Sequence, residues 1–246
     1  GTQNTSCAFN IPAGLYNVVV TDILGCTATI GVTVNDLPPG VATITVPINV
    51  SCNGGSDGSI SVSMAGGTPP FTYLWTDPAA QTTVTATGLQ AGGISVDVTD
   101  SNGCVVNAAG LLSEPAAMSL TFTSDSARCN GVCDGTATVF TSGGTLPYSY
   151  QWDDPLNQVT AGAGNLCADT FNVTVTDGSG CTILGSVIIE EPTAITFSET
   201  HLNAHCGLAD GSGTVTTSGG TGPYTYSWNP GGQTTATANN LLANTY

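Results

Sequence analysis

Hydrophobic and polar residues alternate along most of this chain in short runs. Between residues 38 and 114 the runs occupy 42–46, 59–64, 71–75, 83–87 and 94–98, and a last run follows Cys104. Alternation with a period of two places every second side chain on one face of a β-strand. Glycine-rich clusters typical of turns separate the runs. Six or seven short strands, with a turn about every 10 residues, predict an all-β fold of immunoglobulin-like sandwich type.

One ten-residue phrase occurs three times in the sequence. It reads GGTPPFTYLW at 66–75, GGTLPYSYQW at 143–152 and GGTGPYTYSW at 219–228. The three tryptophans are 77 and 76 residues apart, and cysteine, aspartate and proline positions recur at similar intervals. A period of about 77 residues is typical of a small independent domain rather than of a solenoid repeat.

Prolines that follow acidic residues mark the expected domain boundaries. The segments are 1–37, the C-terminal part of a first repeat; 38–114 and 115–191, two complete sandwich repeats; and 192–246, the N-terminal part of a fourth. We expect these domains to follow one another as a rod. Because the outer repeats are incomplete, we also expect the natural chain to be longer at both ends.

The aromatic residues of the repeated phrase stand at every second position, so they share one face of their strand. We interpret Trp75, Trp152 and Trp228 as core residues, because a thin sandwich needs large side chains to fill it. The alternative is an exposed aromatic platform on which a carbohydrate stacks.

The nine cysteines follow the repeat. Cys52 and Cys104 are 52 residues apart, and so are Cys129 and Cys181, which predicts one disulfide inside each complete repeat. Cys133 and Cys167 have no counterparts in the second repeat and are predicted to pair with each other. Cys26 and Cys206 are expected to have partners outside this segment. Cys7 is left over, without an assigned partner. Disulfides indicate an oxidising, extracellular location, and zinc is disfavoured because no C-x-x-C pair occurs.

The charge balance excludes several partners. The chain has 17 acidic residues, one arginine and no lysine, for a net charge of −16. Nucleic acids and anionic membrane surfaces both require basic residues, so neither is expected as a partner. No apolar run is long enough to span a bilayer.

The sequence contains no recognisable catalytic set, so no enzyme activity is expected. His201 and His205 are the only histidines, and the complete repeats contain none. No cofactor is expected, although calcium remains an alternative because acidic residues recur at turns and junctions. These residues are Asp22, Asp100, Asp177, Asp36, Glu114, Glu190 and Glu191. The other interpretation is that aspartate caps a tight turn through its own side chain.

The segment CNGGSDGSISVSMAGGTPPFTYLW, followed by GLQAGGISVDVTDSNGC, resembles the SprB repeat. Shared features are Cys-Asn-Gly, Asp-Gly, Gly-Gly-Thr-x-Pro with alternating aromatics, Val-Thr-Asp-x-x-Gly-Cys and Glu-Pro. The resemblance covers essentially the whole chain, and the fourth repeat departs from it with CGLADG in place of CNGG. It implies export by the type IX secretion system and display on the cell surface of Bacteroidetes as a filamentous adhesin, carried along the surface in gliding species.

The sequence therefore predicts a structural stalk in a long extracellular adhesin, with neighbouring repeats as the main partners of each domain. Two alternatives remain open. One is a self-assembling extracellular fibre that binds other chains of its kind. The other is a module whose exposed loops bind surface glycans.

Overall fold

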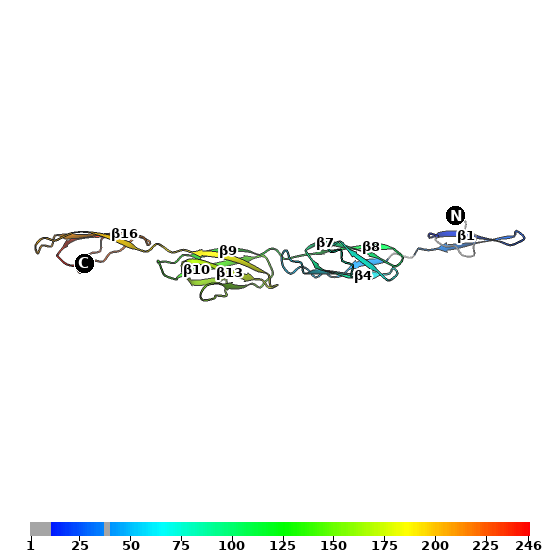
Figure 1. The fold of residues 1–246 in the computed structure, drawn as a ribbon, viewed down its shortest axis with the longest axis horizontal. Helices are drawn as coiled ribbons and strands as arrows, with labels where there is room; N and C mark the ends of the chain where they lie inside the picture. Colours follow the sequence, from blue (N-terminus) through cyan, green and yellow to red (C-terminus); the bar gives the residue numbers. More distant parts are fainter. Residues whose placement is uncertain (1–10, 37–39) are drawn as a thin grey trace. The chain divides into compact units, whose positions relative to one another are not determined.

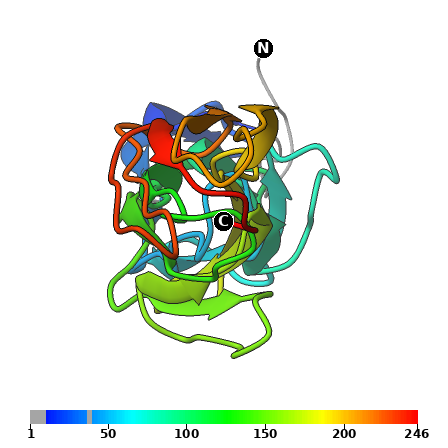
Figure 2. The ribbon, with the colours of Figure 1, turned by 90° about the vertical axis from the view of Figure 1, so that its left-hand side faces the viewer.

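The computed structural model describes residues 11–36 and 40–246. Within these residues the secondary structure consists of strands, turns and bends, and contains no α-helix (Figure 1, Figure 2). The chain divides into two compact units, Gly1–Glu114 and Pro115–Tyr246. Among the described residues there is no helix with the length and hydrophobicity needed to cross a lipid bilayer.

The second repeat is a sandwich of two antiparallel three-stranded sheets. One sheet has the order β3-β4-β6, with β3 at Val41–Ile44, β4 at Gly58–Ala65 and β6 at Thr85–Leu89. The other has the order β5-β7-β8, with β5 at Thr72–Trp75, β7 at Gly92–Thr99 and β8 at Val105–Leu112.

The third repeat has the same topology. Its first sheet has the order β12-β10-β9, with β9 at Ser119–Asp125, β10 at Gly135–Ser142 and β12 at Gly162–Leu166. Its second sheet has the order β11-β13-β14, with β11 at Ser149–Trp152, β13 at Asp169–Thr176 and β14 at Thr182–Ile189. Strands β9, β10 and β13 are labelled in Figure 1. The all-β, immunoglobulin-like sandwich predicted from the alternation is confirmed.

The outer parts of the chain each supply a portion of such a sandwich. Residues 11–36 form one hairpin, β1 at Gly14–Thr21 and β2 at Thr27–Val34, which corresponds to β7 and β8. Residues 192–246 form one sheet of order β15-β16-β17, which corresponds to β3, β4 and β6. Its strands are Thr196–Leu202, Gly211–Ser218 and Thr237–Leu241.

Alternating side chains from both sheets meet in the core of each complete repeat. In the second repeat the buried cluster includes Ile60, Val62, Trp75, Val96 and Val98. Trp75 is 2% exposed, and its indole N–H donates to the Thr83 carbonyl oxygen at 2.8 Å. This bond satisfies the one polar atom of the ring, as burial requires.

The other two tryptophans make the same indole hydrogen bond. Trp152 is 1% exposed and donates to Thr160, and Trp228 donates to Thr235. Trp228 is only half-buried, because it packs over Gly213 of the single sheet that residues 192–246 provide.

The first run of the second repeat is shorter than predicted. We expected a strand over 42–46 with Val46 on the core face, but β3 ends at Ile44 and Val46 is 91% exposed. Pro47 follows directly and has no N–H to donate, so it does not extend the ladder.

The paired glycines of the repeated phrase adopt a backbone conformation that other residues disfavour. Both members have φ between +62° and +77° in all three copies: Gly66–Gly67, Gly143–Gly144 and Gly219–Gly220. In the third repeat a Cβ atom at Gly143 would also collide with the carbonyl oxygen of Ala117. The two glycines therefore let this loop pack against the segment by which the chain comes into the repeat.

Truncation of the core tryptophan tests this account of the sandwich. Trp75→Ala should lower the free energy of unfolding of the second repeat by roughly 3–5 kcal/mol, because it leaves a cavity between the sheets. The matched control is Leu74→Ala on the same strand, where the side chain is 52% exposed. The control should stay within about 0.5 kcal/mol of the wild type in denaturant unfolding. Equal effects of the two substitutions would contradict the core assignment.

Candidate functional site

The recurring polar residues and most of the cysteines lie in loops at the two ends of each sandwich. We call the leading end of a repeat the one formed by its Gly-Gly-Thr loop and its Val-Thr-Asp turn. The trailing end is formed by the Cys-Asn-Gly loop and the Glu-Pro junction. Strands β4 and β8 each connect one end with the other in the second repeat, since each begins next to a loop of one end and finishes next to a loop of the other.

At the leading end of the second repeat, one carboxylate holds two loops together. Asp100 Oδ1 accepts hydrogen bonds from the N–H groups of Asn102 and Cys104, both at 2.9 Å. Asp100 Oδ2 accepts from the N–H of Thr68 in the Gly-Gly-Thr loop at 3.1 Å. The hydrogen bond from Cys104, supported by those from Thr68 and Asn102, lowers the pKa of Asp100 below its ordinary value of 3.8.

The third repeat has the same arrangement. Asp177 Oδ1 accepts from the N–H groups of Ser179 and Cys181 at 2.9 Å, and Asp177 Oδ2 accepts from that of Thr145 at 2.8 Å. Asp177 is only 5% exposed. Burial alone would raise its pKa, but the backbone hydrogen bonds outweigh that effect and lower it. In the first repeat, Asp22 accepts from the N–H groups of Leu24 and Cys26.

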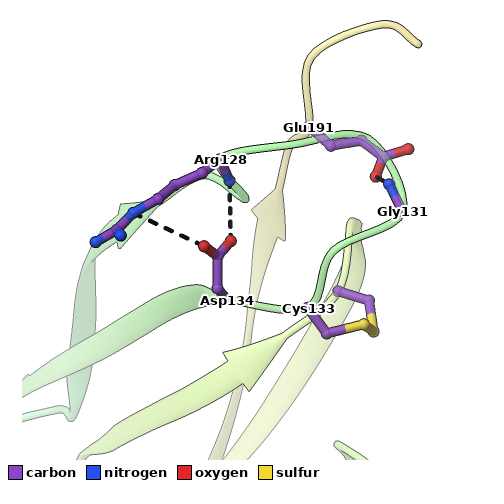
Figure 3. The surroundings of a disulfide bond; sticks show 6 residues. Arg128, Gly131, Cys133, Asp134 and Glu191 are labelled. Carbon is purple, nitrogen blue, oxygen red and sulfur yellow. Dashed lines mark hydrogen bonds and ion pairs between the residues drawn. A yellow bond between two sulfur atoms is a disulfide. The ribbon is translucent and has the colours of Figure 1, made fainter. Parts of the chain in front are cut away.

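At the trailing end, the glutamate of the Glu-Pro junction binds the Cys-Asn-Gly loop. The Glu114 carboxylate accepts from the N–H of Gly54 at 2.6 Å and from the side-chain amide of Asn53 at 3.0 Å. In the third repeat, Glu191 accepts from Gly131 at 2.6 Å and from Asn130 at 2.7 Å. Figure 3 shows the contact between Glu191 and Gly131.

A second acidic residue closes the same loop from the other side. Asp57 Oδ1 accepts from the N–H of Ser51 at 3.0 Å, and Asp134 Oδ1 accepts from that of Arg128 at 2.9 Å. The Arg128 side chain also lies 3.7 Å from Asp134, but it is 88% exposed, so this ion pair contributes little (Figure 3). In the fourth repeat Asp210 accepts from the N–H and the ring of His205.

The acidic residues weighed as calcium ligands therefore cap turns. Among residues 11–36 and 40–246, no three carboxylate, histidine or cysteine side chains come together in a way that could hold a metal ion. The oxygens of Asp22, Asp100, Asp177, Glu114 and Glu191 already face N–H donors, which do not suit a cation. Asp36 and Glu190 join no such group.

The structure contains the Cys133–Cys167 disulfide, with Cα atoms 3.8 Å apart (Figure 3). Cys52 and Cys181 are also disulfide-bonded. Cys104 and Cys129, in contrast, are free thiols. The predicted pairs Cys52–Cys104 and Cys129–Cys181 are therefore wrong.

Strand length explains why the two cysteines of one repeat do not pair. Cys104 stands just before β8, whereas the Cys52 loop is bound to Glu114 just after β8. The eight residues of β8 extend about 26 Å. A disulfide requires Cα atoms roughly 4–7 Å apart, so cysteines at opposite ends of a sandwich cannot meet.

The other predicted cysteines have different outcomes. Cys26 and Cys206 are free and exposed, and partners outside this segment stay a prediction. Cys7 lies outside the described residues.

One hollow in the second repeat lies among its loops rather than beside its aromatic residues. It has a volume of about 420 Å³ and is lined by residues that include Ser56, Asp77, Gln81 and Gln90. No aromatic residue is in its lining. It therefore offers no stacking platform for a sugar ring.

The pH dependence of stability tests the role of the leading-end carboxylate. Since the pKa of Asp100 is lower in the folded state, its ionised form stabilises the fold above pH 3.8. This contribution is lost as the pH falls below 3.8 through the folded-state pKa. Asp100→Asn should lower the denaturant midpoint at neutral pH, and the difference from wild type should shrink below pH 3.8.

The control for this experiment is Asp97→Asn in β7. It removes the same charge from a carboxylate that accepts a side-chain hydrogen bond from Asn107. At neutral pH this variant should lower the denaturant midpoint less than Asp100→Asn does, because Asp100 accepts three backbone hydrogen bonds that join two loops. An Asp100→Asn deficit that is the same at every pH would contradict the assignment.

Comparison with known proteins gives one sequence match and several remote structural ones. The SprB repeat matches residues 44–80, 121–157 and 199–233. No curated protein matches the sequence. One similar structure is the crystal structure of the N-terminal eight Ig domains of Down Syndrome Cell Adhesion Molecule, with a TM-score of 0.40 and 11% sequence identity. The alignment covers 87% of this chain and 32% of that one.

Two further structures have lower scores. The amphioxus IgVJ-C2 molecule has a TM-score of 0.27 and 15% identity, over 55% of this chain and 97% of that one. The complex of Dpr2 Ig1-Ig2 with DIP-Theta Ig1-Ig3 has a TM-score of 0.25 and 10% identity, over 70% of this chain and 72% of that one. Each matched segment contains the Cys-Asn-Gly-type loop, the Gly-Gly-Thr loop and the tryptophan of its repeat, and it ends before the position of the Val-Thr-Asp turn. Three SprB repeats therefore lie between residues 44 and 233 of the chain.

Proposed function

We propose that this chain is a stalk segment of a long, secreted, filamentous adhesin. SprB repeats with an immunoglobulin-like fold and disulfides fit a repeat of a cell-surface adhesin. Such domains have structural or adhesive roles rather than enzymatic ones, which agrees with an extracellular location. The stalk holds an adhesive part away from the cell, and in gliding species it transmits the force of movement.

The observation that carries the proposal is the placement of the two chain ends in each complete repeat. In the third repeat the incoming segment is bound at the leading end, where the Gly144 N–H donates to the Ala116 carbonyl oxygen at 2.7 Å. The outgoing residue Glu191 is bound at the trailing end by Gly131. Each repeat therefore passes the chain from one end of the sandwich to the other, so that added repeats add length.

The side chains support a mechanical role over a chemical one. The carboxylates that recur in every repeat accept backbone hydrogen bonds and hold loops in place. The recurring Trp75 and Trp152 are enclosed in the cores, so they are not available to stack on a glycan.

Small-angle scattering of the chain tests the stalk directly. With strands of eight residues and the turns at both ends, each repeat should add roughly 35–40 Å. The radius of gyration should then be roughly 30–40 Å, whereas a compact protein of 246 residues has about 18 Å. The measurement is made at dilutions where the mass is that of a monomer. A radius near the compact value would contradict the proposal.

A further inference from the structure

We propose that the glutamate of the Glu-Pro junction is a mechanical latch in each complete repeat. It ties the end of the repeat to the segment by which the chain came in, and its rupture sets the rate of unfolding under tension. The latch residue is Glu114 in the second repeat and Glu191 in the third. This inference rests on the proposed stalk, because a latch has a role only in a chain that carries force.

In the second repeat the incoming segment and the last strand run in the same direction. Strand β3 starts opposite the last residue of β4, directly before the Gly-Gly-Thr loop. Strand β8 starts after the turn that binds Thr68 of the same loop. The two strands lie side by side, since a Cβ atom at Gly110 would be 3.2 Å from Ile44 Cγ2. Tension on the chain pulls β3 from its start and β8 from its end, so it slides the two past each other.

Two hydrogen bonds join these segments where both reach the trailing end. The Val50 N–H donates to the Ser113 carbonyl oxygen at 3.0 Å. The Ser113 N–H donates to Asn49 Oδ1 at 2.9 Å. Because these bonds connect the segments side to side, tension along the segments loads both bonds at once.

Glu114 adds the strongest part of this connection. Its carboxylate accepts from the Gly54 N–H at 2.6 Å and from the Asn53 side-chain amide at 3.0 Å. Hydrogen bonds to an ionised group are roughly twice as strong as neutral ones. Glu114 is also the last residue before Pro115. Tension from the C-terminal side therefore reaches Glu114 before any other residue of the second repeat.

The latch offers tension a short path through the repeat. It connects residues 49–54 directly with residues 113–114, although about 60 residues separate them in the sequence. While the latch holds, the strands from β4 to β8 are shielded from part of the tension. Its rupture transfers the load to β8, whose hydrogen bonds with β7 then have to resist it.

The third repeat has the same arrangement within its own unit. Strands β9 and β14 are in contact, and the Ala127 N–H donates to the Glu190 carbonyl oxygen at 2.8 Å. The Glu191 carboxylate accepts from Gly131 at 2.6 Å and from Asn130 at 2.7 Å (Figure 3). The latch is thus built from the same atoms in both complete repeats.

Stretching the intact chain at constant tension in a reducing buffer tests the latch. The buffer opens the disulfides, so the two complete repeats should unfold in two separate steps. Glu114→Gln keeps the size of the side chain but removes its charge and one acceptor oxygen. The waiting time before one of the two steps should fall about tenfold, because a charge-assisted hydrogen bond that resists the first rupture is lost. An unchanged waiting time would overturn the proposal.

The control in the same repeat is Asp77→Asn. The Asp77 carboxylate accepts from the N–H groups of Ala79 and Gln81 at 3.1 and 3.0 Å, in a loop away from both chain ends. Both variants should lower the denaturant midpoint, whereas only Glu114→Gln should shorten the waiting time. Equal shortening would show that the waiting time follows overall stability and would overturn the latch.

A matched pair of substitutions repeats the test in the third repeat. Glu191→Gln should shorten the waiting time of the other unfolding step. Glu190→Gln removes the same charge one residue earlier, from a side chain outside the latch, and should leave both steps unchanged. An equal effect of the two substitutions would assign the change to net charge and would overturn the proposal. Circular dichroism checks that each variant is folded, and an overturned latch would leave the scattering test of the stalk unaffected.

Discussion

The hydrogen bond from a backbone N–H to a carboxylate is the interaction on which this structure depends. With 17 acidic residues and a single arginine, the chain has almost no cationic side chain to offer. Its acids are satisfied instead by turns that point several N–H groups at one carboxylate, as at Asp100, Asp177 and the buried Asp154. Such bonds are stronger than neutral ones and impose a fixed geometry. They hold the loops at both ends of a domain whose core is too small to hold them by packing alone.

The placement of the loops follows from these bonds, and the connection between repeats follows from the loops. Aspartate joins the Gly-Gly-Thr loop to the cysteine turn at the leading end, and glutamate joins the Cys-Asn-Gly loop to the outgoing chain at the trailing end. The paired glycines are needed because the loop lies against the incoming backbone. The same few residues therefore recur in every repeat for a mechanical reason, namely that each repeat must receive the chain at one end and release it at the other.

The sequence predicted the sandwich well and the cysteine pairing badly. Strands β4 and β7 and the core positions of Trp75 and Trp152 follow from local alternation, which sequence records directly. The pairing depended on equal spacings of 52 residues, but repetition makes spacings equal whether cysteines pair within a repeat or between repeats. One signal could have distinguished them: Cys104 is separated from the Glu-Pro junction by the whole of β8, while Cys52 is separated from the next strand by a short loop. The role of Glu114 as a loop anchor had no such signal, because its partners are backbone N–H groups about 60 residues earlier.

A stalk that carries load is expected to limit how far its domains extend, and the Cys133–Cys167 disulfide does so inside the third repeat. Single-molecule stretching from Gly1 to Tyr246, with and without reductant, measures this most directly. The disulfide keeps the 34-residue segment between its cysteines outside the path of the force. The fully extended oxidised chain should therefore be shorter than the reduced chain by at least about 120 Å, at up to 3.6 Å per residue. Equal lengths with and without reductant would contradict this account.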